Sequence, residues 1–441
     1  CINNIEIKMT FDPTEETINV PYEKHEALES LLKKYTDSKL DCQNIIPGIV
    51  AGYANNEKIL DLAAAGVLDH GAKDRDAPEN KMQTESTFLL WSTTKLLTLT
   101  GLFQLVEEGK ISLEDPIEKH IPGFKNKKVA TEVNESGVVT KSEEMNIVPQ
   151  IKHLTTHTCG FSYPFFNEKY QKFMDVANIG GDLLKADKEQ FLNLPLVFQP
   201  GSKWQYGFNI DVIGLIIEEI TGLTLNDYLK KNIFEKCNMS SFSFVRDESH
   251  VKSWVRLHTR DASSTKTFGN ITQTPEFTPL NPKTHCGGHG CFGTVKDYLK
   301  FLQCFINKGV QPMTGQRILK EETISNAFFS DQLKNIGPNC EITSLPNSQP
   351  LITNPIDVYP VTKKTWSHAL LINEEPIDLG DGISRSKNSG MWCGLANLYY
   401  VIDLKKKVVL YWGEELFPFA DMNSFVGFTE FEKFVYTQVT N

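Results

Sequence analysis

One segment, residues 92–108, sets the strongest limit on how this 441-residue chain can fold. It is long enough for a helix of more than four turns, and its apolar residues are Leu96, Leu97, Leu99, Leu102, Phe103, Leu105 and Val106. Those side chains fall on nearly every side of such a helix, and a helix that is apolar all round is buried rather than laid on a surface. Residues 92–108 are therefore predicted to form a helix inside the core.

Strand-like patterns lie near both ends of the chain. Two apolar runs, 45–54 and 58–68, are separated by Asn55-Asn56, which is typical of a β-hairpin, and 398–413 repeats the pattern around a charged turn. Periodicity predicts further helices at 22–36, 211–221, 295–306 and 424–439, the second of them ended by Gly222. Polar stretches at 125–148 and 333–357 lack periodicity and are predicted to be excursions.

The order of these segments predicts an α+β fold in which both ends of the chain complete one antiparallel sheet. A helical region is inserted between them, at about residues 95–320. The length alone allows about three average domains. We instead expect residues 1–441 to form a single domain, because strands at both ends share one sheet.

Charge and hydropathy exclude two classes of protein. Lysine and arginine number 45 against 55 aspartates and glutamates, so the net charge is −10 and the basic footprint that a nucleic-acid partner requires is missing. No uncharged apolar run reaches the roughly 18 residues of a membrane span. We expect a globular protein with neither kind of partner.

The cysteines bear on the compartment. There are nine, an odd number spread along the chain, which excludes a small disulfide-stapled domain and favours free thiols in a cytoplasmic setting. Sequons at Asn134, Asn238 and Asn270 point weakly the other way. The chain begins at Cys1 and not at methionine, so removal of a leader stays open as an alternative.

A Ser-x-x-Lys pattern opens the predicted buried helix, directly after the strand-like residues 87–91. The pattern occurs five times in the chain, and this context singles out Ser92 and Lys95. Residues three apart on a helix share a face, so Lys95 can reach the Ser92 hydroxyl. A lysine whose pKa is lowered by burial can take the proton of a serine nucleophile, and the helix N-terminus offers N–H groups to an oxyanion. The alternative is that Ser92 only caps the helix and Lys95 extends to solvent.

Four ordered segments between about residues 45 and 415 resemble the serine β-lactamase and penicillin-binding-protein superfamily. They are TESTFLLWSTTKLLTLTGLFQLVEEGKISLEDPIEKHIPGF (84–124), IKHLTTHTCGF (151–161), FQPGSKWQYGFNIDVIGLIIEEITG (198–222) and GGHGCFGTVKDYLKFLQ (287–303). Within this superfamily, the chain is most similar to the class C-like branch, which includes family VIII carboxylesterases and fungal statin side-chain acyltransferases. The resemblance implies an α/β/α sandwich of the β-lactamase/transpeptidase type.

The resemblance also implies roles for individual residues. Ser92 becomes the acylated nucleophile, Lys95 its proton partner and Tyr206 an assisting general base. Asn209, in the segment Tyr206-Gly207-Phe208-Asn209, falls one position later than the family's asparagine and is a candidate substrate-binding residue. His289 is expected at the site entrance.

The third family motif departs from the pattern of lactamases. Counting back from Ile402 aligns Asn388-Ser389-Gly390 with Lys-Thr-Gly, so the lysine that binds a substrate carboxylate is absent, and Lys387 stands one residue early. Trp392-Cys393-Gly394 instead resembles the Trp-x-Gly of the esterase and acyltransferase branch, which makes Trp392 and Gly394 candidate substrate-binding residues. Backbone N–H groups of Ser92 and Met391 are expected to form the oxyanion hole.

These observations predict a serine hydrolase or acyltransferase that forms an acyl-enzyme on a small-molecule ester or thioester. Two alternatives stay open, residual β-lactamase or D-amino peptidase activity and a non-catalytic scaffold. No cofactor is expected. The cluster His285, Cys286, His289 and Cys291 has no usual zinc spacing and no evident second group of ligands, so no metal is expected either.

Overall fold

The computed structural model describes residues 22–176, 187–247, 253–268 and 281–440. Its centre is a seven-stranded sheet in the order β2-β1-β14-β13-β12-β9-β8. Every neighbouring pair in this sheet is antiparallel. The strands are β1 (Gly48–Asn55), β2 (Ile59–Gly66), β8 (Lys364–Trp366), β9 (Leu371–Asn373), β12 (Gly390–Gly394), β13 (Leu398–Asp403) and β14 (Val408–Gly413).

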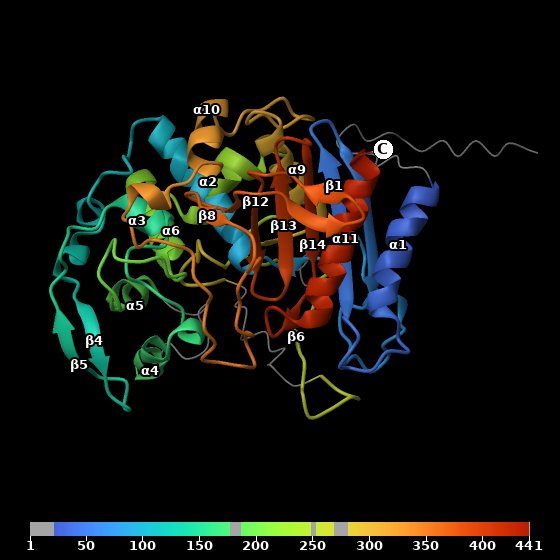
Figure 1. The fold of residues 1–441 in the computed structure, drawn as a ribbon, viewed down its shortest axis with the longest axis horizontal. Helices are drawn as coiled ribbons and strands as arrows, with labels where there is room; N and C mark the ends of the chain where they lie inside the picture. The colour runs from blue at the N-terminus through green and yellow to red at the C-terminus, as the bar shows by residue number, and fades with distance from the viewer. Residues whose placement is uncertain (1–21, 177–186, 248–252, 269–280, 441) are drawn as a thin grey trace, which may run out of the picture.

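Early and late parts of the chain meet at the pairing of β1 with β14, where Val50 lies opposite Gly413. Figure 1 shows the blue and red strands side by side at this point. The two predicted hairpins are β1–β2 and β13–β14, and both are confirmed. Both ends of the chain therefore contribute strands to one sheet, as the order of segments predicts.

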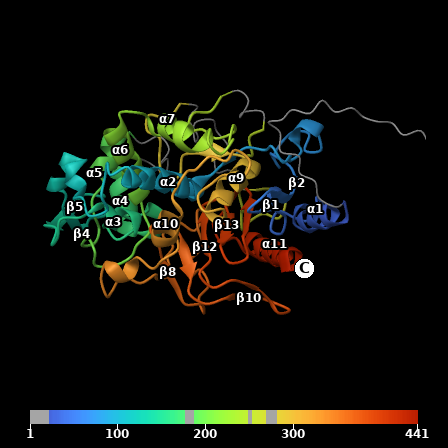
Figure 2. The ribbon, with the colours of Figure 1, turned by 90° about the horizontal axis from the view of Figure 1, so that it is seen from above.

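Helices cover both faces of the sheet. Tyr53 contacts Phe434 of α11 (Met422–Thr440), with 6.3 Å between ring centroids, whereas its neighbour Gly52 faces Leu299 of α9 (Val295–Ile306). Successive strand residues point to opposite faces, so α11 and α9 lie on opposite sides. Helix α1 (Tyr22–Thr36) packs beside α11 against β1 and β2, as Figure 2 shows from above. These layers form the α/β/α sandwich.

The remaining elements lie mainly between β2 and β8 in the sequence. The buried helix is α2 (Thr94–Glu107), whose residues from Thr94 to Leu105 are all buried, as predicted from its apolar pattern. Around it and beside the sheet lie α3 (Ile151–Thr155), α4 (Glu168–Val176), α5 (Lys188–Asn193), α6 (Asn209–Thr221), α7 (Leu225–Leu229), α10 (Glu321–Thr323), β3 (Phe88–Leu89), β6 (His258–Thr259), β7 (Phe292–Gly293), β10 (Ile377–Gly380), β11 (Ile383–Arg385) and β15 (Leu416–Phe417).

Two local differences from the sequence predictions have simple causes. Residues 91–93 form a 3-10 turn, so α2 begins at Thr94 rather than at Ser92. The polar stretch 125–148 contains a hairpin, β4 (Val129–Val133) and β5 (Val139–Glu143), where a loop was predicted and where the inserted region was expected to be all helical. Most of the hairpin's side chains from Thr131 onward are at least partly exposed, so it lacks the apolar alternation that reveals a strand buried on one face.

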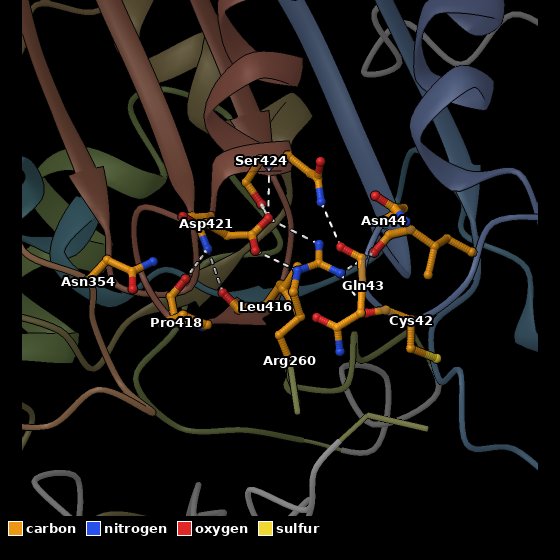
Figure 3. A network of polar contacts seen from close by, with 12 residues as sticks. Cys42, Gln43, Asn44, Arg260, Asn354, Leu416, Pro418, Asp421 and Ser424 are labelled. Atoms are coloured by element: carbon orange, nitrogen blue, oxygen red, sulfur yellow. Dashed lines mark hydrogen bonds and ion pairs between the residues drawn. The ribbon is translucent and has the colours of Figure 1, made fainter. Parts of the chain in front are cut away.

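A buried ion pair fixes the start of α11 to the loop before β1 (Figure 3). Arg260 donates from Nε to Oδ2 of Asp421 over 2.5 Å and from Nη2 to Oδ1 over 3.0 Å. Its Nη1 also donates to the carbonyl oxygens of Cys42 and Ile45, over 2.7 and 3.0 Å. Arg260 therefore joins three segments that are far apart in the sequence.

Replacing Arg260 with methionine is expected to lower the free energy of unfolding by about 3–5 kcal/mol, because the Asp421 carboxylate would be left buried without its partner. Urea unfolding monitored by circular dichroism measures the change. Lys33→Met, which breaks the exposed Lys33–Glu29 pair, is the control and should cost less than about 1 kcal/mol. Equal stability of the two variants would contradict the prediction.

Candidate active site

Ser92 lies at a sharp change of direction between a strand and a helix. Strand β3 leads into the 3-10 turn at Trp91–Thr93, and Trp91 has φ +49°, in the left-handed region that large side chains rarely adopt. The Trp91 indole Nε1 donates to Oε2 of the buried Glu415 over 3.0 Å, and its ring packs on Phe417. These contacts hold a costly backbone conformation in place. In this conformation, Ser92 lies on the wall of a cavity.

Lys95 is held against Ser92 by three hydrogen bonds. Its Nζ donates to Ser92 Oγ over 2.9 Å, to the Tyr163 hydroxyl over 2.9 Å and to the Gly288 carbonyl over 2.7 Å. The side chain is 2% exposed. Burial lowers the Lys95 pKa to about 7, against an opposing effect of the Asp211 carboxylate. Near neutral pH, a large fraction of Lys95 is therefore uncharged and able to accept a proton.

Tyr206 lies against the same ammonium group. The Lys95 Nζ is 4.7 Å from the centroid of the Tyr206 ring, and the Trp392 indole donates to the Tyr206 hydroxyl over 2.7 Å. Burial raises the pKa of Tyr206 well above its ordinary value, although hydrogen bonds with Ser92 and Trp392 act in the opposite direction. The phenol therefore keeps its proton at neutral pH.

The structure adds one residue that the sequence analysis missed. Tyr163 bonds directly to Lys95, is 2% exposed and stacks on Phe165. It stands two residues beyond the family-like segment 151–161, among other aromatic residues, where nothing in the pattern separates it from core packing. Only the tertiary contact with Lys95 identifies it.

The site opens into a cavity whose empty space, including the part open to solvent, is about 550 Å³. Leu345, Ile356 and Val358 reach it from the 333–357 excursion and the residue that follows it. The other lining residues are mainly aromatic: Trp91, Ser92, Tyr163, Phe165, Phe166, Tyr206, His289, Trp392, Cys393, Gly394, Leu395 and Phe419. Of the sequence candidates, Ser92, Tyr206, His289, Trp392 and Gly394 are thus brought together around one space.

Asn209 is not among the lining residues. It is the first residue of α6, is fully buried, and its Nδ2 lies 3.0 Å from Nδ1 of His157. The His157 ring in turn packs on Tyr206, with 4.5 Å between centroids. Burial holds the pKa of His157 well below its ordinary value, so this imidazole is neutral. Asn209 therefore touches the site through His157, not through the cavity.

Met391 is also not among the lining residues. Its side chain is 4% exposed, and its sulfur accepts from Nη1 of Arg385 over 3.3 Å. The stretch that lines the cavity begins one residue later, at Trp392, and runs to Leu395. Counting from Ile402 locates the strand correctly, since Gly390 pairs with Ile402, but does not show which residues face Ser92. Lys387 is exposed and also not among the lining residues.

The eight described cysteines are buried thiols outside any disulfide, whereas Cys1 lies outside the described residues. Of these, Cys393 lines the cavity, and burial raises the pKa of its thiol. Across the part of the chain that the structure describes, no helix is both long and apolar enough to cross a membrane.

Comparisons with known proteins show the family of the chain. The β-lactamase family model matches residues 28–337. Acyltransferase calJ of Penicillium decumbens is 27% identical over 342 residues, which cover 75% of this chain and 76% of that protein. The lovastatin esterase of Penicillium rubens is 27% identical over 342 residues, covering 74% and 78%.

Among solved structures, a simvastatin synthase variant from Aspergillus terreus superposes with a TM-score of 0.76 at 22% identity, over 95% of this chain and 96% of that one. This likeness confirms the predicted α+β fold. The family model covers more than half of the chain, and the Ser92–Lys95 pair lies within the matched residues. The chain belongs to the β-lactamase family.

Proposed function

We propose that this protein is a serine-dependent acyltransferase or esterase that works through an acyl-enzyme on Ser92, with Lys95 as the base. The observation that carries the proposal is the 2.9 Å contact between Lys95 Nζ and Ser92 Oγ at the wall of an apolar cavity. The named relatives include both an acyltransferase and an esterase, so the chemistry they share is acyl transfer from an ester or thioester.

In the first half of the reaction, Ser92 Oγ attacks the substrate carbonyl carbon and its proton passes to Lys95 Nζ. The tetrahedral intermediate collapses, the bond to the leaving oxygen or sulfur breaks, and that atom receives a proton through the Tyr206 hydroxyl. The acyl group stays on Ser92. In the second half, water or an acceptor alcohol attacks the acyl carbon, loses its proton by the same route, and frees Ser92.

Two parts of the backbone are suited to hold the oxyanion of the intermediate. The N–H of Ser92 stands at the start of the turn that leads into α2, and the Trp392–Leu395 stretch, which lines the same cavity, supplies the second donor. The N–H of Met391, one residue earlier on β12, is the other candidate for this donor. Trp392 and Gly394 shape the acyl or acceptor site, and His289 lines the same cavity.

The cavity also favours a neutral substrate over a β-lactam or a peptide carboxylate. Its lining residues include no lysine or arginine among the described part of the chain, and the nearest lysine in the third motif, Lys387, is exposed elsewhere. A substrate carboxylate would therefore enter an apolar space without a cation to pair with. We assign a small-molecule ester or thioester as the acyl donor.

Labelling with a fluorophosphonate tests the nucleophile. The wild-type protein is expected to gain one label, seen as a single adduct by intact-mass spectrometry and mapped to Ser92. Ser92→Ala is expected to gain none, whereas Ser30→Ala, which alters the Ser-x-x-Lys pattern on α1, should label like the wild type. Equal labelling of wild type and Ser92→Ala would overturn the proposal.

The rate should depend on pH in the neutral range. Because burial lowers the Lys95 pKa to about 7, the amine is protonated below pH 7 and cannot accept the serine proton. We therefore expect kcat/KM for a neutral ester to rise through about pH 7 and to fall about tenfold per pH unit below it. A profile measured from pH 5 to 9 on p-nitrophenyl acetate checks this.

The groups around Lys95 leave few other sources for this dependence. Burial raises the pKa of Tyr163, Tyr206 and Cys393 and lowers that of His157, while the Asp211 carboxyl is held below its ordinary pKa against burial by His289 and Lys95. His289 also lines the cavity. His289→Gln should keep the rise near pH 7, and loss of the rise in that variant would contradict Lys95 as its source.

A further inference from the structure

Three metal-ligating side chains meet behind the catalytic lysine, from two separate parts of the chain. Asp211 comes from the first turn of α6, and Cys286 and His289 come from the glycine-rich turn before β7. Their ligand atoms all lie within 4.8 Å of one another, and all three residues are buried. The sequence analysis set this turn aside for lack of a second group of ligands, and the fold supplies that group as Asp211.

The polar atoms of this cluster are incompletely satisfied by protein groups. Nδ1 of His289 lies 3.3 Å from Asp211 Oδ1, which also accepts from the Gly288 N–H over 2.9 Å. Asp211 Oδ2 and His289 Nε2 are buried and make no hydrogen bond to the described residues. Leaving a buried polar atom without a hydrogen bond is costly, so two such atoms in one cluster suit a further partner.

We propose that Asp211, Cys286 and His289 bind one divalent cation of borderline softness, such as Zn²⁺. A carboxylate oxygen, a thiolate sulfur and an imidazole nitrogen suit this class of ion, whereas Mg²⁺ and Ca²⁺ prefer oxygen ligands alone. The carboxylate and the thiolate together neutralise the two charges of the ion, so the occupied site is not a net buried charge. Three protein ligands leave the fourth tetrahedral position for water.

The surroundings supply an entry path and distinguish the three ligands from their neighbours. His289 lines the cavity, so an ion can reach the cluster from that side. Both cysteine thiols of the turn meet a backbone carbonyl oxygen at 3.6 Å, Cys286 that of Thr284 and Cys291 that of Phe292, so position and not bonding separates them. His285 Nδ1 accepts from the Asn226 N–H at 3.4 Å, and neither His285 nor Cys291 has a ligand atom near those of Asp211 and His289.

Cobalt provides a direct test, because a Co²⁺–thiolate bond gives a charge-transfer band in the near ultraviolet and a tetrahedral ion gives intense visible bands. Metal-free protein titrated with Co²⁺ is expected to develop both, saturating at one ion per chain, and Zn²⁺ should displace the signal. Cys286→Ser should abolish the charge-transfer band and weaken Zn²⁺ binding by more than about 100-fold, beyond the loss caused by removing an outer-shell partner. Cys291→Ser, which replaces a buried thiol five residues further along the chain, is the matched control. It should keep both the charge-transfer band and the affinity for Zn²⁺.

Asp211→Asn and His289→Gln give the same test if Cys286→Ser does not fold, and each should weaken Zn²⁺ binding in equilibrium dialysis. Binding of less than one Zn²⁺ per chain, or equal binding by wild type and by Cys286→Ser, would overturn the proposal and leave an ordinary Asp211–His289 ion pair. The measurement needs no turnover. If Zn²⁺ does not bind, the proposed function is unaffected. If the fluorophosphonate test fails, the proposed metal site is unaffected.

Discussion

Replacing Lys95 with methionine is expected to lower kcat/KM for an acyl ester by about 10²–10⁴-fold, the range that a positioned general base contributes. Methionine fills much of the buried space of the lysine stem but cannot accept the Ser92 proton. Ser92 itself stays in place, so fluorophosphonate labelling should become slow rather than disappear. Steady-state rates on p-nitrophenyl acetate and the labelling rate constant measure the two effects.

Lys127→Met is the matched control for that experiment. Burial also lowers the pKa of Lys127, to about 8, and its Nζ donates to the Leu192 and Leu194 carbonyl oxygens, but it is not among the residues that line the cavity. We expect its kcat/KM to stay near that of the wild type. If Lys95→Met retained full activity while folded by circular dichroism, Lys95 would not be the base.

Replacing Tyr206 with phenylalanine is expected to lower kcat by about 10²–10⁴-fold with little change in KM. The phenyl ring keeps its packing against His157 and Trp392, while the hydroxyl that relays the proton to the leaving group is lost. Because the burial-raised pKa keeps this hydroxyl protonated, the proposed mechanism uses it to pass a proton on and keeps Lys95 as the base. A comparison of esters with good and poor leaving groups should show the larger loss for the poor one, which needs the proton more.

Tyr170→Phe separates that effect from the removal of any buried hydroxyl. Tyr170 is fully buried, stacks on Phe208 and is not among the cavity-lining residues. Its loss should leave kcat unchanged. If Tyr206→Phe keeps a normal kcat, the proton relay to the leaving group would be assigned to Tyr163, whose hydroxyl also bonds to Lys95.

Elements with a clear hydrophobic period were predictable from the sequence. The apolar pattern of α2, the alternation of β1–β2 and β13–β14, and Gly222 in a left-handed conformation at the end of α6 each reflect a local preference that the fold keeps. The β4–β5 hairpin was missed because an exposed hairpin has little apolar alternation to reveal it. Such local rules locate elements, but they do not say which of them pack together.

Ser92 and Lys95 could be named from the sequence, because their partnership is set within one helical turn and their context marks it. Tyr163, the Trp392–Tyr206 hydrogen bond and the cluster of Asp211 with Cys286 and His289 could not, since each depends on contacts between residues far apart in the chain. The oxyanion-hole role of the Met391 N–H stays a prediction, because counting along a strand gives its register and not which N–H groups face Ser92. The sequence by itself located the Ser92–Lys95 pair and predicted the fold class. Tertiary packing decided the burial that lowers the Lys95 pKa, the walls of the cavity and the set of groups that surround the reacting atoms.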